Sequence, residues 1–139
     1  MIQILLDNDV VLDFILKRAP FNVEAKEIFD CAGRGEIAIY ISAITPNNVF
    51  YITRKQIDKV TAFKAVEGLL QLAEVCTTDK SVFQKALTLN FTDFEDAVQC
   101  ASAMAENVDA IVTRNLKHYK NSPVKIYSPS KFLQFLQTV

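Results

Sequence analysis

Several residue types that build recognisable sites are scarce in this sequence, and the scarcity excludes some classes of protein. The three cysteines, Cys31, Cys76 and Cys100, follow no metal-ligand spacing and are too few for a disulfide framework. We therefore expect them to be reduced core residues. The only histidine, His118, is more typical of a surface or core residue than of a general base. There are only three glycines, and no internal repeat, linker or low-complexity segment is present.

Long apolar runs and a strong charge of one sign are also missing. No run approaches the roughly 20 residues that span a membrane, and the acids at positions 7 and 9 precede any signal-peptide hydrophobic region. We therefore expect a soluble, cytoplasmic protein with no membrane contact. Because the net charge is only −1, any site for nucleic acid must be a local patch.

The chain has 139 residues and is 50% hydrophobic, which predicts one domain over residues 1–139 with a continuous core. Apolar segments at 2–6, 36–42, 74–77, 109–113 and 124–128 predict strands, and helices are expected between them. Strands that alternate with helices favour a parallel sheet with right-handed crossovers. We therefore expect a three-layer α/β/α sandwich with a central parallel sheet of four to five strands.

Capping residues and helix breakers set the expected helix boundaries. Asn22, Asp58 and Ser128 are each expected at the start of a helix, and Gly33 and Gly35 at the end of one. The expected helices cover residues 10–18, 22–33, 45–55, 58–72, 79–89 and 92–107, with a last helix after Ser128.

The segment 91–115 is expected to be a helix, a buried strand and a polar turn. Thr92 and Glu95 fit a capping box, which predicts the helix start. At roughly 100° per residue, one stripe of this helix is polar and the opposite one is apolar. The polar stripe contains Glu95, Gln99, Ser102 and Glu106, and the apolar one Ala97, Cys100, Ala101 and Met104. Asp96 lies at the border of the apolar side, where a carboxylate needs a partner or a metal.

Acids or amides stand at the expected strand ends and helix starts in three places. They are Asp7 with Asp9, Asp93 with Asp96, and Asn115. Ligands of open α/β sheets bind at the carboxyl ends of the strands. Two carboxylates about 5 Å apart repel by roughly 3 kcal/mol, so a converging cluster favours a cation. Oxygen ligands suit Mg²⁺ or Mn²⁺ rather than zinc.

The segments ILLDNDVVLD, ISAITPNNVFYI, DFEDAVQCASA and DAIVTRN, in this order, resemble the PIN-domain family, especially its small bacterial toxins of VapC type. The resemblance covers essentially the whole chain. It implies a metal-dependent endoribonuclease that uses Mg²⁺ or Mn²⁺ and hydrolyses RNA phosphodiester bonds. It also implies a cognate antitoxin and a homodimer.

The resemblance assigns the acidic site residue by residue. Asp7 and Asp96 match the family's metal-binding and catalytic acids, with Asp93 an accessory catalytic acid. Asn115 falls at the position after TR, which is catalytic and metal-binding. The family's second acid, usually Glu in a pattern like S-x-I-T-x-x-E, falls on Asn48. An amide oxygen at Asn48 can ligate a metal, but it brings no charge and cannot act as a base.

The substrate-binding residues implied next to this site are Thr113, Arg114 and Lys117. Thr113 would be the small polar residue at the strand end, and Arg114 flanks the acids. Asp9 and Glu95 are candidates to replace the negative charge that Asn48 lacks, although an Asp directly after a strand is often only a helix cap.

Two other readings remain open. A PIN-like domain that binds RNA or a protein without cleavage is favoured by Asn48 and Asn115. DNDVVL also fits a haloacid-dehalogenase-like phosphatase, with Asp7 as nucleophile and Asp9 as acid/base, although Asp93 here precedes a strand instead of following one. The apolar positions of the third and fourth helices are either core or a partner surface: Val49, Phe50, Ile52, Ala62, Phe63, Val66, Leu69 and Leu70.

Overall fold

The computed structural model describes residues 1–139 and is built on a five-stranded parallel sheet. The strands are β1 (Ile2–Leu6), β2 (Ile37–Ile41), β3 (Ala73–Val75), β4 (Ala110–Val112) and β5 (Lys125–Tyr127). Their order across the sheet is β3-β2-β1-β4-β5, and every neighbouring pair is parallel. The predicted sheet is therefore confirmed, with β1 at its centre.

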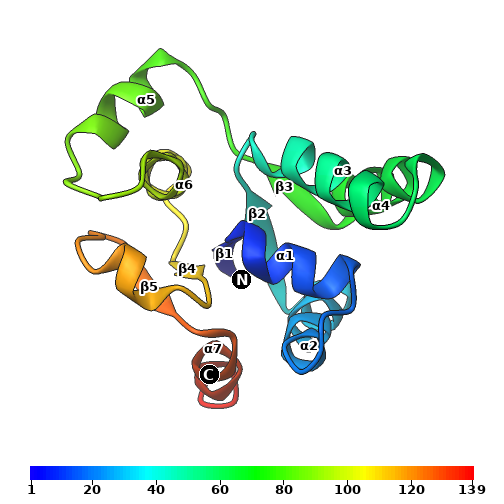
Figure 1. Cartoon of the computed structure of the whole chain (residues 1–139). Helices are drawn as coiled ribbons and strands as arrows, with labels where there is room; N and C mark the ends of the chain where they lie inside the picture. The colour runs from blue at the N-terminus through cyan, green and yellow to red at the C-terminus, as the bar shows by residue number, and fades with distance from the viewer.

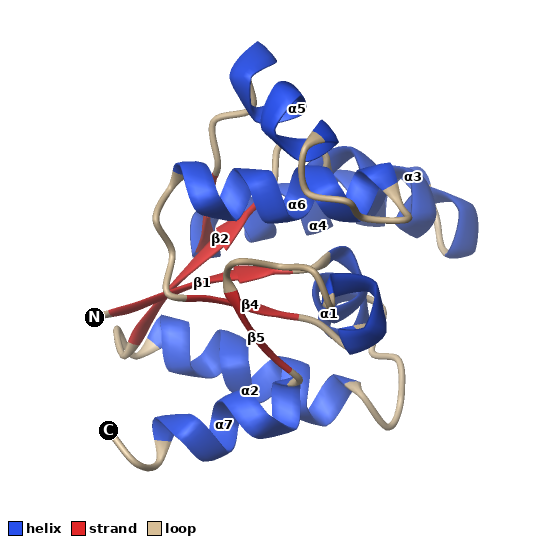
Figure 2. Ribbon diagram, turned by 90° about the vertical axis from the view of Figure 1, so that its left-hand side faces the viewer, coloured by secondary structure: helices blue, strands red, loops and turns tan.

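Helices cover both faces of the sheet, which confirms the three-layer prediction (Figure 1 and Figure 2). α2 and α7 lie on one face, and α6 lies on the other. α3 and α4 pack against each other beside β2 and β3. The helices are α1 (Asn8–Ile15), α2 (Asn22–Gly33), α3 (Thr45–Gln56), α4 (Lys59–Leu72), α5 (Lys80–Leu87), α6 (Phe94–Ala105) and α7 (Pro129–Leu136), with a 3-10 turn η1 (Leu116–Tyr119).

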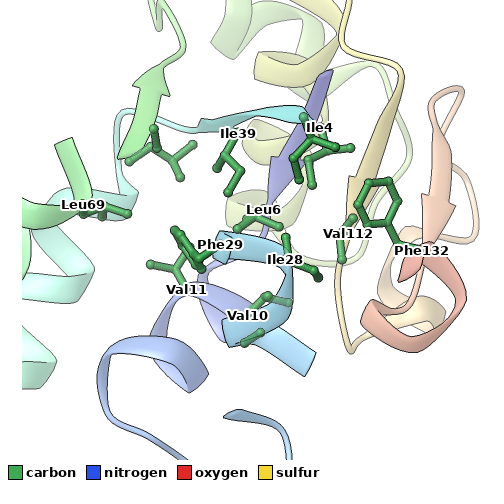
Figure 3. Close-up of a cluster of buried hydrophobic side chains, with 14 of the residues drawn as sticks. Ile4, Leu6, Val10, Val11, Ile28, Phe29, Ile39, Leu69, Val112 and Phe132 are labelled. Carbon is green, nitrogen blue, oxygen red and sulfur yellow. The ribbon is translucent and has the colours of Figure 1, made fainter. Parts of the chain in front are cut away.

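The core lies on both faces of β1, because successive side chains of a strand point in opposite directions. Ile4 and Leu6 pack in the cluster that contains Ile28 of α2 and Phe132 of α7 (Figure 3). Leu5 faces the other way and packs in the cluster of α6. Burial on both faces explains why β1 is apolar at every position from 4 to 6. All three cysteines are buried and free, as predicted.

Three predicted helix starts are confirmed by their caps. The side chains of Asp58, Asp79 and Ser128 each accept a hydrogen bond from a backbone N–H of the first turn that follows. Asn22, in contrast, does not cap α2; it lies inside the first turn, and Phe21 at the cap position offers no side-chain bond.

The first helix is also shifted from its predicted position. It covers residues 8–15 instead of 10–18, because Asp7 caps it immediately after β1. At its other end, Lys17 has a φ of 53°, which no continuing right-handed helix can contain.

The apolar positions of α3 and α4 divide between the core and the surface. Val49, Ala62 and Leu69 are buried, whereas Phe63 and Leu70 are 58% and 49% exposed. The core prediction is therefore confirmed for Val49, Ala62 and Leu69, and a partner surface stays a prediction for the exposed positions. None of the helices combines the length and the apolar character needed to cross a membrane.

Candidate acidic site

The site forms where β1 and β4 end side by side at the centre of the sheet. Asp7 follows β1, and its backbone N–H donates to the carbonyl of Val112 at 3.0 Å. Thr113 follows β4 and is fully buried. Asp7 is only 5% exposed although it carries a carboxylate. It also caps α1, which brings the partial positive charge of a helix start to this carboxylate.

Three donors solvate the buried carboxylate of Asp7. The backbone N–H of Asn8 donates to Oδ1 at 2.7 Å and Gln99 Nε2 at 3.2 Å, while Thr113 Oγ1 donates to Oδ2 at 2.8 Å. Hydrogen bonds to a charged acceptor are stronger than neutral ones and compensate its removal from water. Asp7 is therefore held in one orientation by residues of α1, α6 and the end of β4.

Gln99 is a site residue that the sequence did not indicate. The periodicity of roughly 100° per residue predicts that Gln99 and Ser102 lie on the polar stripe of α6, yet both side chains are fully buried. The apolar stripe does not account for this, because α6 packs between the sheet and α5 and is covered on two sides. The sequence feature that could have indicated Gln99 is its position one helical turn after Asp96, which puts a long uncharged amide near that acid.

Asp96 enters the same site from the first turn of α6. The helix begins one residue later than the capping box predicted, because Asp93 and not Thr92 is the cap; Asp93 Oδ1 accepts from the Asp96 backbone N–H at 2.9 Å. The side chain of Asp96 is 14% exposed, and Oδ2 lies 3.2 Å from His118 Nδ1. Burial first, and then the charges of Asp7 and Asp93, raise the pKa of Asp96 to about 6.

Asp9 is not a helix cap but a largely buried acid beside Asp7. Its Oδ2 accepts from the backbone N–H of Arg114 at 3.0 Å, and its Oδ1 has no partner. Burial first, and the charge of Asp7 second, raise the pKa of Asp9 to about 7. Burial, and then the nearby charge of Asp7, therefore make both Asp9 and Asp96 keep a proton to a higher pH than an ordinary carboxyl does.

Asn48 and Glu95 meet at the outer side of the site. Asn48 Nδ2 donates to Glu95 Oε1 at 3.2 Å, and Asn8 Nδ2 donates to the same oxygen at 2.8 Å. The charge of Glu95 is a further contribution that raises the pKa of Asp96. The contact of Asn48 with this side of the site is therefore its hydrogen bond to Glu95, the residue before Asp96.

The three predicted site residues that follow Thr113 differ in their bonds and in their exposure. Arg114 forms a bidentate ion pair with Asp13, with Nε 2.7 Å from Oδ2 and Nη2 3.2 Å from Oδ1. The Asn115 backbone N–H donates to Thr113 Oγ1 at 3.0 Å, and the side chain of Asn115 is exposed. Lys117 is exposed on η1. Of the three residues implied to bind substrate, only Lys117 has a side chain without a hydrogen bond or ion pair to another residue.

The donor set suits a hard divalent cation. The acids Asp7, Asp9 and Asp96, the Gln99 amide and the Thr113 hydroxyl supply oxygen atoms, which Mg²⁺ and Mn²⁺ prefer, and the only nitrogen ligand type near them is the His118 ring beside Asp96. Six buried side-chain oxygens have no hydrogen-bond partner, and three of them belong to residues near Asp7: Asp9 Oδ1, Gln99 Oε1 and the Tyr119 hydroxyl. Burial, with Asp7 and Asp96 nearby, also raises the pKa of Tyr119. No group of three or more His, Cys, Asp or Glu side chains is arranged as a ready-made cage for a metal ion.

A family model described as a PIN domain matches residues 3–117. The chain belongs to the PIN-domain family. The match includes β1, the α3 segment, α6 and the turn after β4, which are the four segments that carried the resemblance. Membership of this family decides against the dehalogenase-like reading of Asp7 and Asp9.

Solved structures of the VapC type share this PIN fold. The chain aligns with VapBC2 of Rickettsia felis, bound to a promoter DNA fragment, at 19% identity and a TM-score of 0.71, over 91% of this chain and 98% of the other. DNA-bound VapBC of Salmonella typhimurium gives 20% identity and 0.71 over 93% and 99%. VapC20 of Mycobacterium tuberculosis, a sarcin-ricin-loop-cleaving toxin, gives 12% and 0.62 over 78% and 86%. No curated protein sequence matches the chain significantly.

Proposed function

We propose that this PIN-domain chain is a metal-dependent endoribonuclease and the toxin of a bacterial toxin-antitoxin pair. The observation that carries the proposal is the approach of Asp7 and Asp96, from two different elements, at the carboxyl edge of the sheet. Burial first, and then the charge of Asp7, raise the pKa of Asp96, and a divalent cation would relieve the repulsion between the two carboxylates. The family and its VapC-type neighbours support the same reading.

In this proposal the metal ligands are Asp7, Asp96 and the amide oxygens of Asn48 and Asn115. Mg²⁺ or Mn²⁺ would lower the pKa of the attacking water and stabilise charge on the phosphate. Asp93 contributes by capping α6, which places Asp96. Asp7 is oriented by the donors described above, so little of its side-chain freedom remains to be lost on binding.

RNA would approach from the side of η1. Lys117 and Lys120 are exposed there and have no carboxylate partner, so both can neutralise phosphates. Arg114 retains 28% exposure of its side chain beside Asp13, and we assign it mainly a structural role. Thr113 would affect the substrate only indirectly, because its hydroxyl donates a hydrogen bond to the Asp7 carboxylate.

Titration with MnCl₂ by calorimetry, together with cleavage of a structured RNA panel, tests the proposal. Asp7→Asn and Asp96→Asn should each abolish both metal binding and cleavage. Asp30→Asn is the matched control, because Asp30 is an exposed acid of α2 that pairs only with Lys26. If the wild type binds no Mn²⁺ at millimolar concentration, the nuclease assignment is wrong.

A PIN domain that binds RNA or a partner without cleaving it is the second candidate. It is favoured by the two uncharged amides: Asn48, where the family usually has Glu, and Asn115, where it often has Asp and sometimes Asn. In this case the chain would bind RNA with unchanged affinity in the presence of EDTA, and no RNA of the panel would be cut.

The proposed partners are a cognate antitoxin and a second copy of the chain. The exposed apolar side chains of α3 and α4 form the surface that such partners would cover: Tyr51, Ile57, Val60, Phe63 and Leu70. Size-exclusion chromatography with light scattering should show a dimer. A monomer at high micromolar concentration would reject the homodimer.

A further inference from the structure

The carboxylate of Glu95 is fixed by residues from two other helices, which is unusual for an exposed acid in a first helical turn. Asn8 of α1 and Asn48 of α3 both donate to Oε1, from 87 and 47 residues away in the chain. Favourable interaction with the helix dipole requires no such contacts. Fixing a flexible Glu side chain costs conformational entropy, so the arrangement needs another explanation.

The two amides are themselves part of a longer chain of hydrogen bonds. Asn8 Oδ1 accepts from Thr45 Oγ1 at 2.6 Å, and Thr45 Oγ1 lies 3.3 Å from Ser42 Oγ at the end of β2. Because Thr45 occupies the oxygen of Asn8, the Nδ2 of Asn8 must face outward as a donor. The chain of bonds that begins at the buried end of β2 therefore finishes on an acceptor, Glu95.

The position of Glu95 connects this chain to the acidic site. Glu95 directly precedes Asp96 in α6, and its first amide donor, Asn8, directly follows Asp7. Both donors use Oε1, so Oε2 accepts no hydrogen bond from the protein and is free for a ligand. Asn48, the residue of α3 that bonds to Glu95, contributes an amide and no charge.

We propose that Glu95, held by Asn8 and Asn48, supplies a further carboxylate to a cation bound at Asp7 and Asp96. This inference rests on the proposed metal-dependent function and identifies a further ligand of its cation. In this proposal α6 provides, as Glu95, the carboxylate that α3 lacks at position 48. Asn48 orients that carboxylate through its hydrogen bond.

Exchanging the two hydrogen-bonded side chains tests this directly. MnCl₂ is titrated by calorimetry into the wild type, Glu95→Gln, and a double variant with Asn48→Glu and Glu95→Asn, which moves the carboxylate to the other side of the same contact. Glu95→Gln should weaken Mn²⁺ binding at least about tenfold, and the double variant should recover most of the loss. Glu67→Gln, at an exposed position of α4, should bind as the wild type does.

Urea unfolding of the same proteins separates a ligand from a structural tie between helices. Suppose that Glu95→Gln strongly lowers the urea midpoint and that the double variant restores the midpoint but not the Mn²⁺ affinity. Glu95 then only connects the helices, and the inference fails. It also fails if Glu95→Gln binds Mn²⁺ as tightly as the wild type, and that result leaves the proposed nuclease intact. A wild type that binds no Mn²⁺ overturns both.

Discussion

Replacing Arg114 by methionine separates a structural role for this residue from a role in binding RNA. Its guanidinium forms two hydrogen bonds to Asp13, whose side chain is 1% exposed. Its Cζ also lies 3.9 Å from the ring centroid of Phe21. Arg114→Met keeps an apolar stem against that ring but removes the charge, so Asp13 retains only Arg18 as a partner.

The size of the effect follows from what Asp13 loses. Removing one partner of a fully buried ion pair typically costs about 3–5 kcal/mol, and loss of the cation-π contact adds about 0.5–1 kcal/mol. Two features reduce the cost: Arg114 is 28% exposed, and Arg18 Nε remains 2.9 Å from Asp13. We therefore expect the free energy of unfolding to fall by about 2–4 kcal/mol.

Urea unfolding followed by far-ultraviolet circular dichroism measures this change. The matched control is Lys117→Met, which removes an exposed charge without a partner and should change the free energy of unfolding by less than about 0.5 kcal/mol. A loss below about 1 kcal/mol for Arg114→Met, accompanied by weakened RNA binding, would refute the structural role. It would return Arg114 to the substrate-binding set.

Three further predictions concern the acids. Thr113→Val removes the hydroxyl donor to Asp7 and should lower the free energy of unfolding by about 1–2 kcal/mol in a urea titration; an unchanged midpoint would contradict this. The pKa values of about 7 for Asp9 and about 6 for Asp96, against an ordinary 3.8, mean that the metal-free folded protein binds more protons than the unfolded chain in this range. Its thermal midpoint in EDTA should therefore fall as the pH rises from about 4 to about 7, and Mn²⁺ should reverse the fall; a flat profile would contradict the raised pKa values of these two acids. Gln99→Met removes a buried amide whose Oε1 is unpaired, so stability should change by less than about 1 kcal/mol while Mn²⁺ affinity drops; calorimetry that finds full affinity would exclude Gln99 from the site.

Local sequence was sufficient for most of the fold because its signals act over a few residues. The alternating directions of a strand that is buried on both faces require apolar residues at every position, and β1 shows this in its sequence. Asp58 and Asp79 indicate helix starts because a cap bonds a backbone N–H only three residues away. The same locality placed Asp7 at the end of a strand, and therefore in the site.

The contacts that build the site depend on tertiary structure. Gln99 and Thr113 reach Asp7 from 92 and 106 residues away, and Arg114 reaches Asp13 from 101. A helical wheel assumes one buried face, whereas α6 is covered by the sheet and by α5, so its polar stripe contains a fully buried amide. Pairing between distant side chains depends on where the elements dock, and the local pattern of apolar residues does not specify it. The sequence thus predicted which acids lie at the edge of the sheet, and only the packing of α1, α3 and α6 decided which side chains bond to them.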